Sequence, residues 1–376
     1  MNTNGKGAPH AGLGEVPARI LAGQMDFAAA WQRVQEKAGM PGADGVSVRA
    51  FARAATANLR ALAARLASEQ YRPDPLRLAE AEKRSGGRRL LLIPTVADRV
   101  AQSAAALWLS AKWNPHFDPA SFAYRPGLGV HDALRSLAAL RDRGYRWVLD
   151  ADIRSFFDSI DHELLFEKLT RWLGAGSPLL GWIGSWVAAV VWDGAGVRCL
   201  ARGVPQGSPL SPLLANFYLD EFDQRLRRTG VRFVRYADDF LVLARSPFEL
   251  AQSRTVVEEA LKELRLNLSE EKTRTTTFEQ WFRFLGADIQ GERILLPFEQ
   301  KKPAKRPVAV APVMPRALLN AYRAGHLKPA GPLQWAARQV EITAAQASGS
   351  QGKRLAALAA SPTDAVLEAL RTGVPL

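Results

Sequence analysis

The chain has 376 residues, 47% of them hydrophobic, which excludes a disordered protein and allows two or three packed modules. Its net charge of +13 favours a polyanionic partner, most often nucleic acid, although a basic soluble protein is the alternative. The single cysteine, Cys199, excludes an internal disulfide and a Cys-rich zinc site. The lack of a signal-peptide pattern and of a bilayer-length apolar run favours a cytoplasmic protein without membrane association.

Residues 1–24 are rich in glycine, alanine and proline, and we expect them to form a flexible tail. Beyond them, segments with helical spacing of apolar residues alternate with short segments typical of strands. The predicted helices span 26–38, 48–70, 94–113, 130–141, 179–191, 211–227 and 247–264, and another begins near Asp161. The predicted strands span 77–82, 88–93, 146–152, 198–201, 232–236, 240–244, 281–289 and 293–296. This order, with local hairpins, favours an α+β fold over a doubly wound parallel sheet.

The composition changes after residue 296. From Pro297 onward the chain has eleven basic and four acidic residues. This excess predicts a separate, basic and mostly helical module over 297–376. A docking domain or a basic flexible tail is the alternative.

Two acidic sites lie far apart in the sequence, and each follows an apolar strand. The first contains Asp150 and Asp152, and the second is the adjacent pair Asp238 and Asp239 at a tight turn. Clustered carboxylates repel one another and are costly to desolvate, and a divalent cation removes that cost. We expect Asp152 and Asp238 to be ligands of two Mg²⁺ ions about 3.5–4 Å apart, with Asp239 beside them. Mn²⁺ accepts the same oxygen ligands, and Asp150 shares a strand face with Asp152, so both alternatives stay open.

Five segments resemble, in order, the sequence boxes of reverse transcriptases, and the second is similar to the first catalytic box of the group II intron branch. They are 121–127 (SFAYRPG), 152–162 (DIRSFFDSIDH), 203–212 (GVPQGSPLSP), 236–239 (YADD) and 284–286 (FLG). The resemblance covers roughly residues 40–290 and implies a right-hand polymerase with fingers, an antiparallel palm and a helical thumb. It implies an N-terminal extension and fingers over 25–145, a palm over 146–296 and a thumb or accessory module over 297–376.

The resemblance also implies roles for individual residues. The catalytic residues would be Asp152, Asp238 and Asp239, and the metal site would also include Ile153. The nucleotide-binding residues would be Lys83, Arg89, Phe157, Gln206 and Gly207. Phe157, or alternatively its neighbour Phe156, would exclude a ribose 2′-hydroxyl, and core packing is the other explanation for this pair. A solvated basic turn is the alternative for Lys83 and Arg89.

A further set of residues is expected to contact nucleic acid. It consists of Arg125, Lys272, Phe284, Leu285 and Gly286. For Lys272, a surface ion pair is an equally good interpretation. The run Leu90-Leu91-Leu92 departs from the usual sequence of the family, which leaves the register of the fingers open.

The sequence therefore predicts an RNA-directed DNA polymerase that uses an RNA template, a DNA or RNA primer and dNTPs. The segments around 122–127 and 130–133 look closer to CRISPR-associated reverse transcriptases. This favours a role in prokaryotic antiviral defence, such as spacer acquisition from RNA with a CRISPR integrase complex. The alternatives are a group II intron-like enzyme for repair or retromobility and a catalytically silent nucleic-acid-binding scaffold. An RNA-templated RNA polymerase is disfavoured by Phe157.

Overall fold

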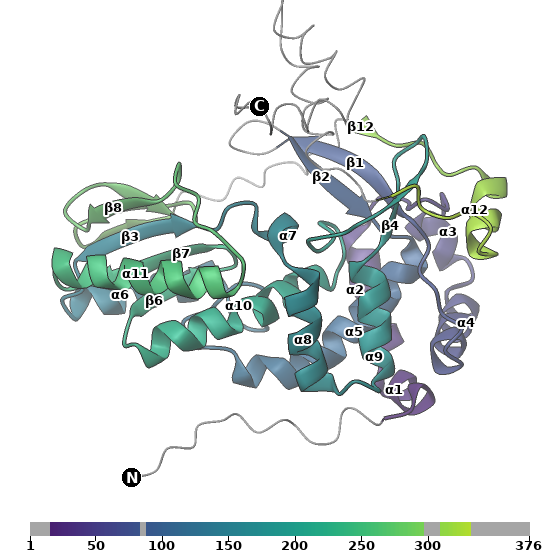
Figure 1. Ribbon diagram of the computed structural model, residues 1–376, viewed down its shortest axis with the longest axis horizontal. Coiled ribbons are helices and arrows are strands. Elements are labelled where there is room, and N and C mark those ends of the chain that lie inside the picture. Colours follow the sequence, from purple (N-terminus) through teal and green to yellow (C-terminus); the bar gives the residue numbers. More distant parts are fainter. Residues whose placement is uncertain (1–15, 83–87, 297–308, 332–376) are drawn as a thin grey trace, which may run out of the picture.

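The computed structural model describes residues 16–82, 88–296 and 309–331, which form an elongated molecule with three β-sheets (Figure 1). Helices and mostly antiparallel strands follow one another along the chain, so the predicted α+β class is confirmed. A helical region and a five-stranded sheet form one end of the molecule, and a four-stranded sheet lies at the other end. Within the described residues, no helix combines the length and the apolar character that crossing a membrane requires.

The helical region is built around α5 (Val96–Trp113), which is buried over much of its length. The helix begins at the N-cap Thr95, whose side chain accepts a hydrogen bond from the backbone N–H of Asp98. Helices α2 and α4 contact α5, and α1 and α3 contact α4. These four helices are α1 (Ala18–Gln24), α2 (Phe27–Lys37), α3 (Val48–Ala52) and α4 (Ala55–Ala67).

The five-stranded sheet has the order β12-β1-β4-β5, with β2 on the other side of β1. Its strands are β1 (Leu76–Glu82), β2 (Arg88–Ile93), β4 (Val190–Trp192), β5 (Val197–Cys199) and β12 (Ala309–Val310). On the side away from β2, β1 pairs with β4 through Leu76 and Arg77, and with β12 through Ala79 and Glu80. Residues 309–331, which we call the strap, therefore join this sheet and continue into α12 (Arg316–Arg323).

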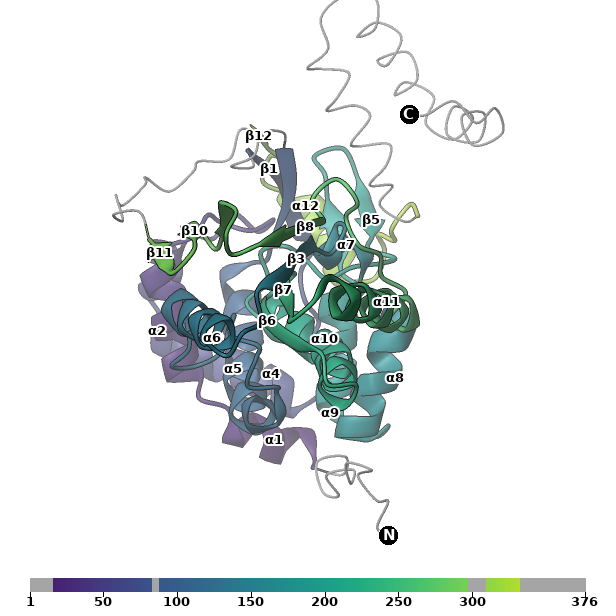
Figure 2. The same ribbon diagram turned by 90° about the vertical axis from the view of Figure 1, so that its left-hand side faces the viewer.

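The four-stranded sheet has the order β6-β7-β3-β8 and is antiparallel throughout. Its strands are β3 (Trp147–Asp152), β6 (Arg232–Tyr236), β7 (Asp239–Ala244) and β8 (Arg274–Thr277). Because side chains alternate along a strand, Val148 belongs to the core cluster under α6 and Leu149 to the cluster under α10 and α11. Figure 2 shows the sheet between these helices, which are α6 (Val130–Asp142), α10 (Ser211–Arg228) and α11 (Pro247–Glu263).

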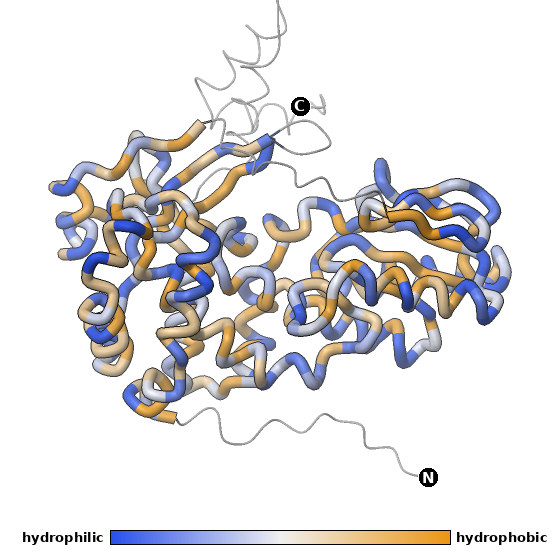
Figure 3. Tube along the Cα trace, turned by 180° about the vertical axis from the view of Figure 1, so that it is seen from behind, coloured by the Kyte–Doolittle hydropathy of each residue, from blue (hydrophilic) through white to orange (hydrophobic). Residues whose placement is uncertain are grey.

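A smaller sheet and three helices complete the described part of the chain. The three-stranded sheet contains β9 (Phe282–Phe284), β10 (Ala287–Gln290) and β11 (Arg293–Leu295). The helices are α7 (Phe156–Ser159), α8 (His162–Leu173) and α9 (Pro178–Val187). Along most helices hydrophobic and hydrophilic residues alternate, as amphipathic helices on a shared core require (Figure 3).

Two predictions for the N-terminal part need correction. The expected tail over 1–24 is wrong for Ala18–Gln24, which forms α1, because Ala18, Leu21 and Ala22 lie on one helical face and are buried. The helix expected over 48–70 is two helices, α3 and α4. The side chain of Asn58 donates a hydrogen bond to the carbonyl of Phe51, at the point where α3 ends.

Two other predicted elements have different limits. The helix expected over 179–191 ends at Val187, and Val190–Trp192 instead pairs with β1 as a strand. The strand expected over 281–289 is divided into β9 and β10, since Leu285 and Gly286 have φ angles of +52° and +83° and reverse the chain.

The predicted C-terminal module over 297–376 also needs correction. Residues 297–308 and 332–376 lie outside the described part of the chain, so the expectation for them stays a prediction. The strap, however, is not separate from the body. Met314 and Leu319 are buried in one cluster with Trp192 and Val197, because these apolar side chains cover the open end of the five-stranded sheet.

Candidate active site

The turn between β6 and β7 presents two adjacent carboxylates. Tyr236 and Asp239 are paired across the hairpin, so Ala237 and Asp238 form a two-residue turn. Ala237 has a φ of +62°, which is the conformation that the first position of a type II′ turn requires and that glycine usually supplies. A non-glycine residue held in this region indicates local strain that the surrounding structure maintains, and such positions concentrate at functional sites.

The strand register brings the second acidic site to this turn. Asp152, the last residue of β3, lies directly opposite Asp239 of β7. The next residue, Ile153, donates its backbone N–H to the carbonyl oxygen of Asp238 at 3.2 Å. The predicted meeting of the two acidic segments is therefore found in the structure, with Asp152, Asp238 and Asp239 at the same end of the sheet.

The carboxylates carry the electrostatic cost expected of a buried acidic cluster. Burial raises the pKa of Asp239 to about 7, with the charges of Asp150, Asp238 and Asp152 adding to the effect. Burial and the charge of Asp152 also raise the pKa of Asp238. The cationic Nζ of Lys272 lies 2.9 Å from Oδ2 of Asp152 and compensates part of this charge. The cluster is thus an environment in which added positive charge is stabilising.

The donor set suits a divalent ion that is shared with a substrate. Within the described residues, no group of three or more His, Cys, Asp or Glu side chains is arranged to hold a metal ion by itself. Mg²⁺ is commonly held by one or two carboxylates together with substrate phosphates, so Asp152 and Asp238 fit this mode of binding. The side chain of Ile153 is a hydrocarbon, so this residue can contribute only its backbone carbonyl oxygen.

Asp150 lies near this group, since its charge acts on Asp239, but it is paired with an arginine. Its Oδ2 accepts a hydrogen bond of 2.9 Å from Nε of Arg274 on β8. The cleft beside the carboxylates is lined by Asp152 and Asp238, whereas Asp150 and Asp239 do not line it, and of these two only Asp150 is paired with an arginine. The structure therefore distinguishes two residues that strand alternation alone left equivalent.

A cleft of about 620 Å³ lies against the acidic cluster. It is bounded by β2, the segment around Tyr124, the start of α7, and the loop before β8. Seven predicted site residues line it: Arg89, Asp152, Ile153, Phe157, Gln206, Asp238 and Lys272. Lys83 lies outside the described residues. Cations, carboxylates and an amide thus surround one cavity, which can bind a molecule that carries both phosphates and a polar base.

Gln206 and Gly207 join this cleft to the five-stranded sheet. The carbonyl of Gln206 accepts a hydrogen bond of 2.8 Å from the backbone N–H of Leu92, and its side-chain amide donates to Oδ1 of Asp158 at 2.9 Å. Gly207 has a φ of +133°, and a Cβ atom there would lie 2.5 Å from the carbonyl oxygen of Leu92. Only glycine allows the loop to approach β2 this closely.

The two adjacent phenylalanines have different environments. Phe156 is 1% exposed and belongs to the main core, whereas Phe157 is partly buried and packs against that core. Their rings lie 5.4 Å apart in an edge-to-face arrangement, and both border the cleft. Phe157 is thus the one with a surface that a ligand can reach, and Phe156 supports it from beneath.

Arg125 and Phe284 make extensive contacts within the protein, and their predicted contact with nucleic acid stays a prediction. The guanidinium of Arg125 makes four hydrogen bonds within the protein, to the side chain and carbonyl of Asn114 and to the carbonyls of Asp118 and Ser121. These bonds hold the loop before α6 and use four of the five N–H groups of the guanidinium. Phe284 is 2% exposed and packs in the core. Leu285 and Gly286 form the turn beyond it.

Sequence reasoning did not identify the buried support of the carboxylate turn. Arg235 is 1% exposed and pairs with Asp223, which is fully buried. Its Nη1 donates to Oδ1 of Asn216 at 3.1 Å and to the carbonyl of Ala237 at 3.0 Å. The side chain of Asn216 donates in turn to the carbonyl of Ala123. The one available signal was that Arg235 directly follows the apolar pair Phe233 and Val234 within the strand.

Tyr124 was also missed as a cleft residue. It follows Ala123, is 48% exposed and has a φ of +59°. Partial burial and the charge of Asp238 raise its pKa. Tyr124 thus lines the cleft, and Ala237 precedes the lining residue Asp238. Arg235 bonds the carbonyl of Ala237 directly and is connected through Asn216 to the carbonyl of Ala123.

Comparisons with known proteins agree with this geometry. A family model described as reverse transcriptase (RNA-dependent DNA polymerase) matches residues 81–289, more than half of the chain. Protein YkfC of Escherichia coli strain K12 is 31% identical over 288 residues, which cover 65% of this chain and 74% of YkfC. The group II intron-encoded protein LtrA of Lactococcus lactis is 28% identical over 292 residues, which cover 59% of this chain and 48% of LtrA.

Among solved structures, a partial Cas6-RT-Cas1–Cas2 complex contains a chain that is 29% identical to this one, with a TM-score of 0.38. The match covers 63% of this chain and 40% of that chain. The present chain therefore spans about half the length of LtrA and a smaller share of the chain in the complex.

Proposed function

The chain belongs to the reverse transcriptase family, and from this premise we propose that its cleft adds deoxynucleotides to a primer 3′-hydroxyl along an RNA template. The observation that carries the proposal is the pairing of Asp152 with Asp239, beside Asp238, at the edge of a cleft lined by cations. The α+β fold is that of a right-hand polymerase. We assign the four-stranded sheet to the palm and the five-stranded sheet to the fingers.

We assign the divalent metal site to Asp152, Asp238 and Asp239, with the carbonyl of Ile153 as a further oxygen donor. When bound, Mg²⁺, or Mn²⁺ in its place, supplies positive charge that lowers the pKa of the primer hydroxyl and neutralises the triphosphate. The carboxylates hold this charge at the end of two paired strands, where their positions are fixed by the ladder between β3 and β7. Preorganised charge of this kind reduces the reorganisation needed during the reaction.

The other cleft residues are assigned to the incoming nucleotide. Arg89, together with Lys83 as the resemblance implies, would bind the triphosphate, since guanidinium and ammonium groups donate strong hydrogen bonds to phosphate oxygens. Gln206 is oriented by Asp158 and would lie beside the nascent base pair. Phe157 would contact the sugar and exclude a 2′-hydroxyl. Positioning by these groups, without a covalent enzyme intermediate, is sufficient for phosphoryl transfer.

We propose that the biological role is prokaryotic antiviral defence, in which RNA is copied for CRISPR spacer acquisition with an integrase partner. Support comes from the segments 122–127 and 130–133, which resemble CRISPR-associated reverse transcriptases. The likeness to LtrA supports an alternative, a group II intron-like enzyme for repair or retromobility. Co-purification with the Cas1–Cas2 integrase of the same host, followed by an RNA-dependent acquisition assay, separates the two roles.

The activity is tested by dNTP incorporation on annealed poly(rA)/oligo(dT) with Mg²⁺. We expect synthesis by the wild type, loss of synthesis in Asp238→Ala, and normal synthesis in Asp142→Ala, which removes an exposed carboxylate on α6. Incorporation of rNTPs in preference to dNTPs would indicate an RNA polymerase. A folded wild type that binds RNA without any synthesis would instead identify a nucleic-acid-binding scaffold.

A further inference from the structure

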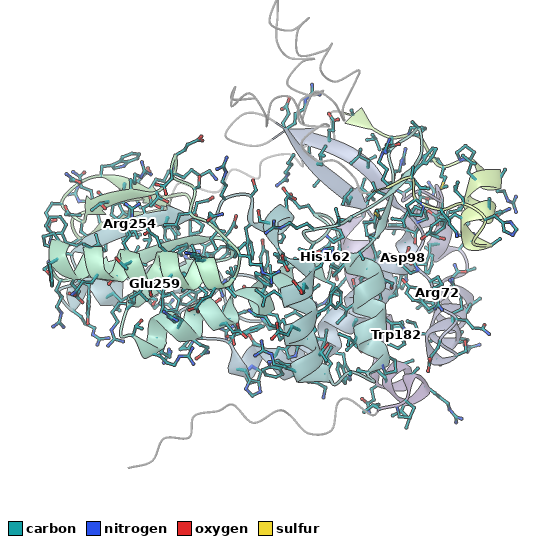
Figure 4. The ribbon with its side chains drawn as sticks, in the orientation of Figure 1. Arg72, Asp98, His162, Trp182, Arg254 and Glu259 are labelled. Carbon is teal, nitrogen blue, oxygen red and sulfur yellow. The ribbon has the colours of Figure 1, made fainter. Side chains whose placement is uncertain are left out.

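A second cavity lies at the end of the molecule away from the four-stranded sheet. It has a volume of about 690 Å³ and is formed between the end of α4 with the loop before β1 on one side, and α12 with the residues after it on the other. In Figure 4, Arg72 marks this end, whereas Arg254 and Glu259 mark α11 at the opposite end. The volume is within the range of ordinary ligand pockets.

The pocket is strongly cationic. Arg65, Arg72, Arg323 and Lys328 line it together with a single carboxylate, that of Asp74. Both oxygens of Asp74 are occupied by Arg323, at 2.8 and 2.6 Å. Within the described part of the chain, Arg65, Arg72 and Lys328 form no ion pair with any carboxylate. Three positive charges without a carboxylate partner therefore border one cavity, and together they attract an anionic ligand.

Two of these cations are held in place by the backbone. Nη2 of Arg65 donates to the carbonyl of Arg72 at 3.2 Å, and the Arg65 guanidinium lies 5.5 Å from the centre of the Tyr71 ring. Nη1 of Arg72 donates to the carbonyls of Glu69 and Tyr71 at 3.0 and 2.8 Å. Each guanidinium keeps further N–H groups beyond these bonds, so both are preorganised donors rather than freely rotating side chains.

We propose that this pocket binds the phosphate groups of a nucleic-acid strand at a site distinct from the polymerase cleft. Fixed guanidinium groups recognise phosphate oxygens better than isolated ammonium groups do, and a strand offers several phosphates at regular spacing. The ligand would contact Arg65 and Arg72 from the N-terminal region and Lys328 from the strap. A bound nucleic-acid strand would therefore help to hold the strap against the body, together with the ion pair between Arg323 and Asp74. The proposal does not depend on catalysis in the other cleft.

The test is the salt dependence of binding by the full chain to a fluorescein-labelled 12-nucleotide single-stranded RNA. Each phosphate neutralised on a single strand contributes about 0.7 to the slope of log K against log salt concentration. Arg72→Gln/Lys328→Gln should therefore reduce the magnitude of the slope by about 1.4. Lys328→Gln alone should reduce it by about 0.7, and this variant leaves the bonds made by Arg72 intact.

The matched control is Arg171→Gln. Arg171 is also exposed, but its charge is met by Glu221 at 3.1 Å and Glu167 at 3.9 Å, so its removal should leave the slope unchanged. Poly(rA)/oligo(dT) extension at low salt should be preserved in the double variant, because the polymerase cleft is untouched. An unchanged RNA slope would overturn the pocket assignment, whereas absence of extension by the wild type would overturn the polymerase assignment, so the two failures are distinguishable.

Two further measurements decide between sources of phosphate. Single-stranded DNA of the same length should show the same loss of slope if the backbone is what is recognised. Inorganic tripolyphosphate should compete only at concentrations well above those of the strand. An unchanged slope in both variants, or displacement of the strand by equimolar tripolyphosphate, would overturn the proposal.

Discussion

The guanidinium of Arg235 donates a hydrogen bond of 3.0 Å to the carbonyl of Ala237, the left-handed residue in the turn that carries Asp238. The same side chain is neutralised by Asp223 and bonded to Asn216. One buried cation thus connects the carboxylate turn to the core of α10. We infer that Arg235 is a positioning residue, which acts on the reaction through the turn and not by touching the substrate.

Replacing Arg235 tests this inference. Arg235→Met should lower the free energy of unfolding by about 3–5 kcal/mol, because the buried Asp223 is left without its partner. Asp223→Leu/Arg235→Met should recover most of that stability, since a hydrophobic pair of similar volume replaces the ions. The double variant should still show a reduced kcat with a nearly unchanged KM for dNTP. Full recovery of kcat would mean that the hydrogen bond to Ala237 does not position the turn.

Substitution of Gly207 tests the contact between β2 and the loop that contains Pro205-Gln206-Gly207. Gly207→Ala places a Cβ atom 2.5 Å from the carbonyl of Leu92, so the loop must move and the bond between Leu92 and Gln206 must lengthen. We expect a lower melting temperature and a large loss of dNTP incorporation. Gly127→Ala is the control, because it has a φ of +76° with open space around the new methyl group. Equal losses of melting temperature and of dNTP incorporation in the two variants would show that the positive φ, and not the contact with Leu92, is responsible.

Substitutions of Phe157 and Phe156 should have different effects. The first should change the choice between dNTPs and rNTPs, and the second should change the free energy of unfolding. Phe157→Ala should raise the incorporation of rNTPs relative to dNTPs, because it removes the aromatic surface that faces the cleft. Phe156→Ala should mainly lower the free energy of unfolding, by about 3–5 kcal/mol, since that ring is fully buried. Single-nucleotide extension with competing rNTP and dNTP measures the first effect, and urea unfolding measures the second. A gain in rNTP use only in Phe156→Ala would reverse the assignment.

Replacement of Lys272 should change the Mg²⁺ concentration that the reaction requires. Its ammonium group is paired with Asp152, so an incoming metal ion must compete with that charge. Lys272→Gln should therefore lower the Mg²⁺ concentration that gives half-maximal activity, while stability changes by less than about 1 kcal/mol because the pair is exposed. The measurement is a Mg²⁺ titration of primer extension at constant ionic strength. An increased Mg²⁺ requirement would indicate that Lys272 assists substrate binding instead.

Asp98 should make stability depend on pH. Burial, and then the charge of Asp74, raises the pKa of Asp98 to about 7, although Tyr71 and Thr95 donate hydrogen bonds to it. The nearby Arg323 and Tyr322 also interact with its charge.

The sign of the effect follows from the raised pKa. In the folded state the carboxyl keeps its proton up to about pH 7, whereas in the unfolded chain it loses the proton near pH 4. The contribution to stability is present below about pH 4 and is lost as the pH rises to 7. Urea unfolding at pH 5 and 7.5 should show a smaller difference for Asp98→Asn than for the wild type. Parallel pH profiles would contradict the prediction.

The sequence was sufficient to locate the carboxylates and most helices. Aspartates at the ends of apolar strands and helical spacing are local signals, and the strands β3, β6 and β7 agree closely with the predicted ranges. Strand β8 had no such signal: Arg274–Thr277 is polar, and it becomes a strand only because β3 offers it an edge. Uniformly apolar residues likewise could not show where α9 ends and β4 begins.

The roles of individual cations were the hardest to predict. Arg125 lies in a segment that resembles a conserved box, yet neighbouring carbonyls take up its donors. The pattern predicts only a strand residue at Arg235, although its side chain bonds the carbonyl of Ala237 in the turn. Whether an arginine faces a ligand or the interior depends on which carbonyls and carboxylates the fold brings within about 3 Å, and these partners come from distant parts of the chain.

The pairing of the strap with β1 has a consequence for biosynthesis. Nε of Arg77 donates to the carbonyl of Ala311, a residue 234 positions later in the chain. During translation, β1 is therefore made long before β12 can reach it, and the edge of β1 at Ala79 and Glu80 stays open until the strap is made. Open edges invite pairing with other chains. A nascent or prematurely terminated product should consequently depend on chaperones far more than the finished protein does.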